Sequence, residues 1–245
     1  MSQPELLREL QLPQAHLSAA SALVRVAERL FVVADDELHL GLFDLGDPAP
    51  GRLVRLFEGS LPAEKRARKA AKPDLEALAL LPAMAGFAQG ALLALGSGST
   101  PGRQRGVLLG LTEQAAPRLI DLAPLYRPLH AQFADLNIEG GFLLGDEFLL
   151  LQRGNQGQAS NAAVRYAWHA LRDWLLGTGE APAPRAIQRL ELGELQGVAL
   201  GFTDGAALAD GRWLFSAVAE NTADSYNDGA CLGAGIGLVE AGGQG

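Results

Sequence analysis

The feature that most constrains the fold is an outline that recurs along the chain: a polar residue stands at the start of a short apolar run. It reads SALVRV, LEALALLP, IEGGFLLG and ELQGVALGF in turn, and the polar anchors are Ser21, Glu76, Glu139 and Gln196. Short apolar runs bounded by Gly, Pro, Asp and Asn are typical of β-strands. Repeats slightly above 50 residues that hold several such strands are typical of propeller blades.

Each repeat reads as a series of short strands, so the sequence predicts an all-β fold. We expect a single β-propeller domain over residues 1–245, with about four visible four-stranded blades. The repeat units are predicted at residues 19–60, 74–127, 137–192 and 194–240. One stretch, NAAVRYAWHALRDWLL, has helical spacing and predicts a short helix over about 168–176, inserted before the last strand of the third unit.

The fourth unit shows three strands and lacks an outermost one. The N-terminal segment 6–13, LLRELQLP, resembles the outer strands RLIDLAPL and AIQRLEL of units two and three. Two arrangements stay open. Residues 6–13 close a ring of four blades, which removes free sheet edges, or the chain carries four blades of a five-bladed parent, which its abrupt GGQG end favours.

Composition limits the classes of function. The formal net charge of −8 argues against a nucleic-acid binder, which would show a basic face. No apolar run is long enough to span a membrane, and the first residues lack the pattern of a secretory signal. We expect a cytoplasmic protein; a mature periplasmic form whose signal peptide has been removed is the alternative. A small-molecule ligand or substrate is the expected partner.

The propeller geometry predicts where polar residues gather. The first strand of a blade lines the central channel and the second runs back, so the start of one and the end of the other share a face. Carboxylates converging there raise one another's pKa unless a metal or cations relieve them. The residues expected at that face are Lys72, Glu76, Arg103, Arg105, Glu139, Arg153, Asn155, Gln196, Glu220, Asn221 and Asp224.

Three roles are predicted within this set. Oxygen ligands suit a hard cation such as Ca²⁺, and the predicted metal ligands are Glu76, Glu139, Asn155 and Asn221. Asp224 or Glu220 is the predicted general base, and the substrate is expected to contact Lys72, Arg103, Arg105, Arg153 and Gln196. In the alternative reading, the acidic residues only tie neighbouring blades together.

Five segments, KPDLEAL, GSGSTPGRQRG, NIEGG, QRGNQG and NAAVRY, resemble an uncharacterised bacterial β-propeller family. That family is similar to phytase-like esterases and, more distantly, to propellers of the gluconolactonase and paraoxonase type. The resemblance implies a calcium ion at the channel mouth, held here by Glu76, Glu139, Asn155 and Asn221. It therefore implies a metal-assisted hydrolase of a lactone, ester or phosphoester. The alternative is a non-catalytic propeller that binds a small ligand or a protein partner.

Overall fold

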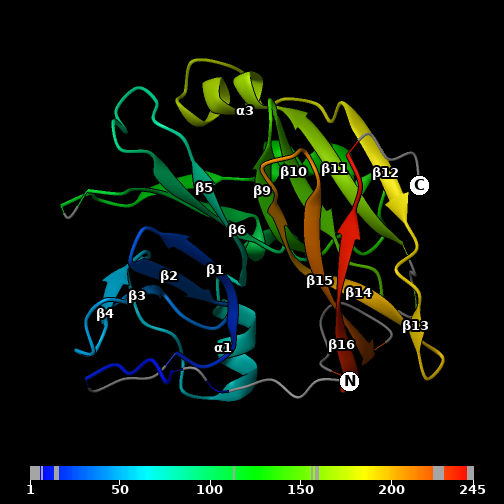
Figure 1. The fold of residues 1–245 in the computed structure, drawn as a ribbon, viewed down its shortest axis with the longest axis horizontal. Coiled ribbons are helices and arrows are strands. Elements are labelled where there is room, and N and C mark those ends of the chain that lie inside the picture. The colour runs from blue at the N-terminus through cyan, green and yellow to red at the C-terminus, as the bar shows by residue number, and fades with distance from the viewer. Residues whose placement is uncertain are drawn as a thin grey trace.

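The chain folds into four antiparallel sheets that follow one another along the sequence. The computed structural model describes residues 6, 8–13, 17–112, 114–155, 157, 160–222 and 229–241. Each sheet has four strands, and the four are arranged as the blades of a β-propeller (Figure 1). The predicted all-β propeller is confirmed. No helix in the described residues is long and apolar enough to cross a membrane.

The strands fall into four sheets in chain order. The first contains β1 (Ala20–Val26), β2 (Arg29–Ala34), β3 (His39–Asp44) and β4 (Arg52–Arg55). The second contains β5 (Leu75–Leu81), β6 (Ala91–Gly96), β7 (Arg105–Gly110) and β8 (Arg118–Asp121). The third contains β9 (Ile138–Leu144), β10 (Glu147–Gln152), β11 (Asn161–Ala167) and β12 (Ala186–Leu190). The fourth contains β13 (Glu194–Leu195), β14 (Val198–Ala207), β15 (Trp213–Asn221) and β16 (Ala230–Val239).

Short helices occupy the connections. The predicted helix is confirmed as α3 (Trp168–Leu175), which buries Leu171 and Leu175. The sequence reading missed α1 (Lys65–Ala71) and α2 (Ala123–His130), which follow the outer strands of blades one and two. The α1 sequence has no apolar stripe, but Glu64 caps it by accepting two backbone N–H bonds. A single 3₁₀ turn covers Pro101–Arg103.

The fourth blade is built differently from the others. The inner strands β1, β5, β9 and β14 pack on one another in that order, so β14 holds the inner position. Its fourth strand is β13, a two-residue strand that pairs with β14 through Glu194 and Leu195. The outer side of the sheet ends at the third long strand, β16.

The N-terminal segment lies along the first blade over its described residues. The Arg8 guanidinium donates to the carbonyl oxygens of Leu45 and Asp47, and the Gly51 amide donates to the Gln11 carbonyl. In this structure these residues therefore contact the β3–β4 side of blade one, and not β16.

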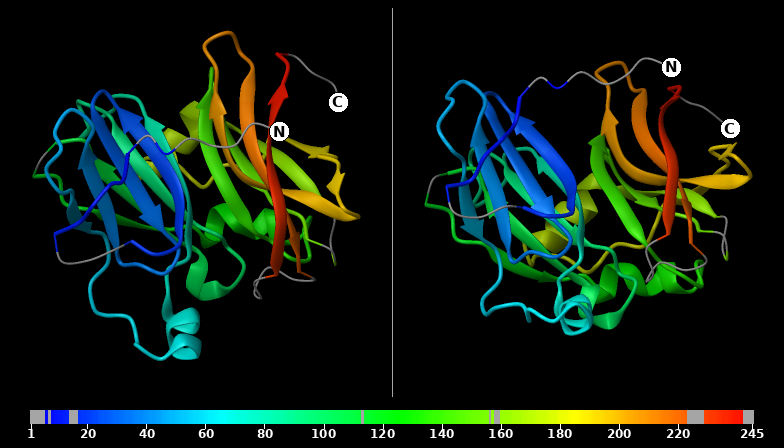
Figure 2. Two further views of the ribbon diagram at one scale, coloured as in Figure 1. Left: turned by 60° about the horizontal axis from the view of Figure 1, so that its bottom comes forward. Right: turned by 90° about the horizontal axis from the view of Figure 1, so that it is seen from below.

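Three apolar interfaces join the blades. Leu75 and Leu78 pack against Val33 and Leu40 of the first blade, and Leu95 packs near Ile138 in the second interface. The third interface centres on the aromatic rings of Phe142, Phe202, Trp213 and Phe215, with centroids 5.1–6.1 Å apart. Among the described strands, β1 has no comparable contact with the fourth blade. The ring is therefore open between blades one and four, as Figure 2 shows.

Backbone hydrogen bonds link the blades in series at one end of the inner strands. The Asp35 amide donates to the Ala19 carbonyl, and the Asp74 amide donates to the Asp35 carbonyl. The Ser97 amide donates to the Asp74 carbonyl, and the Ile138 amide donates to the Ser97 carbonyl. We call this end of the propeller the pole. Buried backbone groups must be paired, so this series fixes where β1, β5 and β9 begin.

Asn161 continues the series into the fourth blade through its side chain. Its Oδ1 accepts hydrogen bonds from the amides of Gly154 and Phe202, and its Nδ2 donates to the Leu200 carbonyl at 2.8 Å. Asn161 is buried, so its two bonds to Leu200 and Phe202 join blade three to blade four out of reach of water, and the bond from Gly154 holds the side chain within blade three.

We expect Asn161→Ala to lower the free energy of unfolding by roughly 2–3 kcal/mol, because it leaves buried backbone groups unpaired. Chemical denaturation measures this change, and Gln114→Ala in an exposed connection is the matched control. A loss below about 0.5 kcal/mol, the size typical of surface substitutions, would show that this side chain does not join the blades.

Candidate functional site

One-residue β-bulges mark the polar end of the inner strands. The ladder register shifts between Ala20 and Ala22, between Leu75 and Ala77, and opposite Ile138 and Gly140. The extra residues are Ser21, Glu76 and Glu139, which are three of the four anchors of the sequence repeat. A bulge leaves its extra residue unpaired and re-aims the side chain. The sequence repeat therefore reflects a recurring β-bulge, which directs one polar side chain of each of these strands to the pole.

The fourth anchor is not Gln196. The corresponding bulge in β14 lies between Phe202 and Asp204, so the extra residue is Thr203. Gln196 lies in the tight turn between β13 and β14 with φ of 54°. The Thr203 hydroxyl is 2.7 Å from the Ser216 hydroxyl. The bulge residue of unit four therefore lies seven residues after the predicted anchor, because the β13–β14 hairpin precedes the part of β14 that serves as the inner strand.

Lys72 and Arg103 neutralise the carboxylates of the first two blades. The Lys72 ammonium pairs with Asp35 and lies 2.8 Å from Asp74. The Arg103 guanidinium lies 3.0 Å from the other Asp74 oxygen, which also accepts from Ser97. Burial lowers the pKa of Lys72, but the two carboxylates outweigh it and the net shift is upward. Both predicted substrate contacts are thus ion-paired inside the protein.

Arg153 plays the same part between blades three and four. Its guanidinium lies 3.2 Å from Glu139 and also pairs with Glu220. Glu139 further accepts from the Asn137 side-chain amide at 2.7 Å. Burial raises the pKa of Glu139, and Arg153 opposes that rise. Glu220, a predicted general base, is therefore held by a salt bridge.

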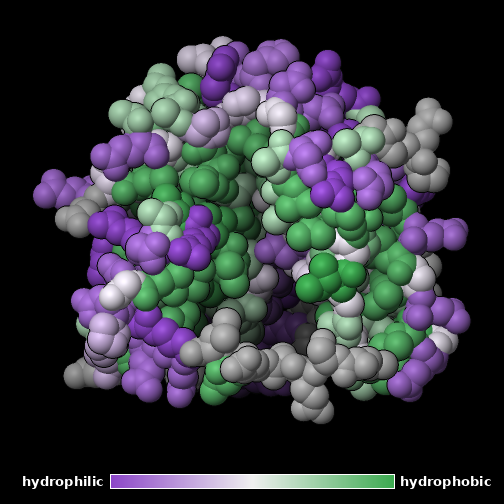
Figure 3. All heavy atoms as spheres, in the orientation of Figure 1, coloured by the Kyte–Doolittle hydropathy of each residue, from purple (hydrophilic) through white to green (hydrophobic). Residues whose placement is uncertain are grey.

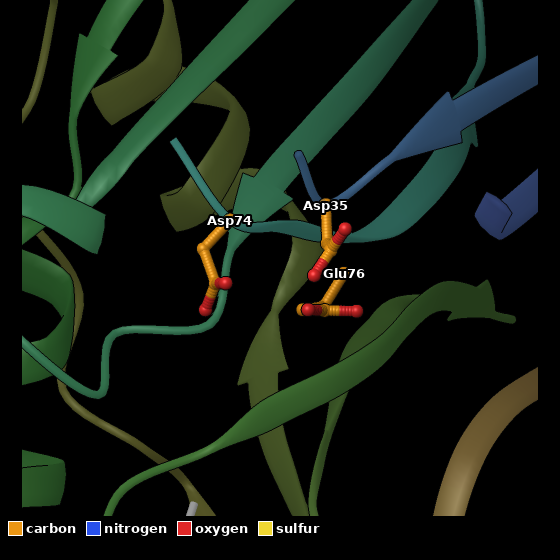
Figure 4. Close-up of side chains that lie close together, drawn as sticks. All are labelled: Asp35, Asp74 and Glu76. Carbon is orange, nitrogen blue, oxygen red and sulfur yellow. The ribbon is translucent and has the colours of Figure 1, made fainter. Parts of the chain in front are cut away.

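Glu76 lies between these two networks. Figure 4 shows it beside Asp35 and Asp74, with the three carboxylates directed to the same side, and oxygens of all three fall within 4.8 Å of one another. No cation pairs with Glu76 within the part of the chain that the structure describes; Ser21 is its hydrogen-bond partner. Burial raises the pKa of Glu76 well above its usual range, and Glu139, Asp74 and Asp35 raise it further.

The other predicted residues lie apart from this centre. Arg105 is exposed and stacks over the Phe57 ring at 5.4 Å. The Asn155 amide donates to Asp135 at 2.5 Å. Asn221 ends β15 and is exposed. Asp224 lies outside the described residues. Of the predicted metal ligands, Glu76 and Glu139 interact electrostatically, whereas the group of closely spaced oxygens is Asp35, Asp74 and Glu76.

A groove of about 640 Å³ runs past all four inner strands. Figure 3 shows the hollow between the two halves of the molecule, with hydrophobic residues on its walls. Leu23 and Leu80 are 57% and 42% exposed there. The groove is lined by Leu23, Val24, Arg25, Leu78, Ala79, Leu80, Gly141, Phe142, Leu143, Asp204, Gly205, Ala206, Ala207, Leu214, Phe215, Ser216 and Ile236.

The groove approaches the acidic pole through Asp204. This carboxyl lines the groove, and repulsion from Glu139 contributes to its raised pKa, so it lies near the acids of the pole. On β5, Leu78 and Leu80 line the groove, and Glu76 precedes them in the strand on the side of the pole.

Asp204 is the functional candidate that sequence reasoning missed. It follows the bulge at Thr203, lines the groove and accepts a hydrogen bond from the Gly205 amide. Burial raises its pKa to about 7, and repulsion from Glu139 adds to the rise. A carboxyl that titrates near neutral pH inside a pocket is typical of a functional site. The sequence held one signal that could have located it. Thr203, which precedes Asp204, lies 64 residues after Glu139, and Glu139 lies 63 residues after Glu76, so the two repeat spacings agree.

Comparison with known proteins identifies a family whose function is unknown. A family model described as "Family of unknown function (DUF6929)" matches residues 16–244. No curated protein sequence matches the chain.

Replacing Glu76 should stabilise the protein above acidic pH. The pKa of Glu76 is higher in the folded state than its ordinary value of 4.5, so its contribution to stability declines as pH rises through the interval between them. We expect Glu76→Gln to gain about 1–3 kcal/mol at pH 8, the size of an uncompensated buried polar group, and to gain little at pH 4. Thermal melts across this range measure it, with Glu194→Gln on the surface as control. Equal melting temperatures of wild type and Glu76→Gln at pH 8 would contradict this account.

Proposed function

We propose, from the premise that the chain belongs to the family of unknown function DUF6929, that the protein binds a small amphipathic cation in the groove between its blades. The observation that carries the proposal is the groove itself. Its volume of about 640 Å³ falls within the range of small-molecule sites, which are concave, mostly apolar and equipped with a few polar groups.

The walls favour an apolar body. Leucines of the first two blades line the groove together with Phe142 and Phe215 of the last two. Leu23 and Leu80 are exposed and Phe215 is partly exposed in the folded chain, so a ligand that covers them gains hydrophobic free energy without unfolding anything. At about 25 cal/mol per Å² of apolar surface, a hydrocarbon tail supplies most of the affinity.

The charges favour a cationic head group. At the pole, five carboxylates lie near only three cations, so negative charge is in excess there. The carboxylates are those of Asp35, Asp74, Glu76, Glu139 and Glu220, and the cations are Lys72, Arg103 and Arg153. Asp204 adds one more carboxyl inside the groove. Glu76 and Asp204 have no salt bridge among the described residues. Burial is the main cause of their raised pKa values and repulsion from other carboxylates adds to it, so an organic cation would offset that repulsion.

Alkyl probes that differ only in the head group test this proposal. We expect decyltrimethylammonium to bind at least about tenfold more tightly than decanol or decanoate, about 1.4 kcal/mol. Because the pKa of Asp204 is about 7, its charged form prevails at pH 8 and is lost toward pH 6. Affinity for the cation should therefore fall as pH drops through this window. Isothermal titration calorimetry below the micellar concentration measures both effects.

Asp204→Asn should remove the preference for the cation and its pH dependence, while Glu194→Gln on the exposed β13 should leave both unchanged. Equal affinities for the three probes would reject the cationic head group. Failure of every probe to bind the wild type would reject the groove as the ligand site.

A metal-assisted hydrolase is the second candidate function, and one observation favours it. The closely spaced oxygens of Asp35, Asp74 and Glu76 are the donors that Ca²⁺ prefers. A bound ion would act as a Lewis acid on a lactone, ester or phosphoester carbonyl or phosphoryl group. The resemblance to esterase and lactonase propellers supports the same candidate.

The fit to a metal is incomplete because Lys72 already contacts two of the three carboxylates. An ammonium group between Asp35 and Asp74 supplies the positive charge that an ion would bring. Among the described residues, only Glu76 of the three acids lacks a cationic partner. The donor set therefore favours the ligand-binding reading over the hydrolase.

Metal analysis separates the two candidates. We expect no stoichiometric metal in the purified protein and no change in melting temperature on adding 1 mM Ca²⁺, roughly the weak end of protein calcium affinities. A stabilisation by Ca²⁺ that disappears in Glu76→Gln, together with turnover of p-nitrophenyl esters, would instead favour the hydrolase.

A further inference from the structure

The outer edge of the fourth blade differs from the other three. In blades one to three, the third strand is covered by β4, β8 or β12. The corresponding strand of the fourth blade, β16, pairs with β15 on one side and with no described strand on the other. Figure 2 shows β16 in red at the margin of its sheet. Half of its backbone N–H and C=O groups point outward in an antiparallel ladder, so this edge is open for pairing.

The outer strands of the other blades carry the usual protection against such pairing. β4 and β8 are four residues long and β12 is five, and they present Arg52, Arg118 and Arg189. Short length and charge are devices that keep sheet edges from joining. β16 has ten residues, ACLGAGIGLV, with no charge and no proline. Ile236 in its middle is 81% exposed and Leu238 is 41% exposed.

We propose that β16 is the interface of a homodimer, in which two copies of the chain pair their β16 edges antiparallel across a two-fold axis. A two-fold interface joins the same patch on both subunits, and a strand with no charge meets its own copy without like-charge repulsion. The chain carries a net charge of −8, so an uncharged edge lowers the electrostatic cost of bringing two copies together. The joined sheet would run through eight strands.

The regular part of the strand fixes the register. The ladder with β15 shifts between Gly233 and Cys231, whereas Gly233–Val239 pairs without interruption. The middle of that stretch is Ile236. An axis at Ile236 brings the two isoleucines together and sets Gly235 against Gly237, with small residues opposite Leu238 and Val239. No atom lies within 4 Å of the position that a Cβ would occupy on Gly235, so no described side chain covers that face of the strand beside the axis.

Solution mass tests the interface. We expect light scattering after size exclusion to give twice the chain mass of 25.7 kDa. Ile236→Lys should be monomeric, because it sets two ammonium groups against each other at the axis. Leu53→Lys, which changes a leucine that is 37% exposed on β4, should remain dimeric. A monomeric wild type, or a dimer that survives Ile236→Lys, would overturn the proposal.

Disulfide trapping tests the register independently of stability. Directly opposed residues in an antiparallel pair have Cα atoms about 4.5–5.5 Å apart, within the range that a disulfide spans. In a Cys231→Ser background, which removes the single native cysteine, Ile236→Cys should give a covalent dimer under mild oxidation. Leu53→Cys in the same background should stay monomeric on a non-reducing gel. Equal trapping of both variants, or of neither, would overturn the β16 pairing.

Discussion

The rest of the structure depends on the hydrogen bonds that join each blade to the next at the pole. The amides of Asp35, Asp74, Ser97 and Ile138 donate across successive strands, so main-chain groups fix the start of the inner strand in the first three blades, and the Asn161 side chain continues the series into the fourth. A bulge at Glu76 and at the matching residues of the neighbouring blades then turns one side chain per blade toward the axis. The hydrogen bonds between the blades determine where the site lies, and the residues at the bulges determine the charge of the site.

This division explains what the sequence could predict. The sequence identifies three bulge residues, Ser21, Glu76 and Glu139, because the bulge recurs once in each repeat and the repeat can be recognised from sequence spacing alone. Thr203 was missed because the β13 hairpin inserts a second polar start, at Gln196, seven residues earlier. Spacing alone does not tell an inserted hairpin from an inner strand, whereas the ladder register does. The helices α1 and α2 were missed because each is short and packs in a connection, where capping and tertiary contacts outweigh periodicity.

The sequence predicted that a metal or cations would relieve the carboxylates, but it could not predict which residues pair, for a different reason. Lys72 and Arg153 were expected to face a substrate, and both instead bridge carboxylates from different blades. Partner choice depends on which loops meet in three dimensions, and burial makes pairing obligatory once they meet. The pairing leaves Glu76 as the carboxylate of this cluster that no cation neutralises among the described residues. The acids near the pole thus form two ion-paired networks with the Glu76 carboxyl between them.

The exposed apolar surfaces also indicate a binding site at the opening of the ring. Three exposed large side chains, Leu23 of blade one, Leu80 of blade two and Ile236 of blade four, line the groove at the opening of the ring. Exposed apolar area of this kind costs free energy in water, and a contiguous patch of it marks an interaction site more often than chance. The fourth blade combines both features, because β14 carries Asp204 into the groove while no described strand covers the edge of β16. Ile236 belongs to both, since it lines the groove and stands at the proposed two-fold axis, so a ligand and a second chain would meet at this residue.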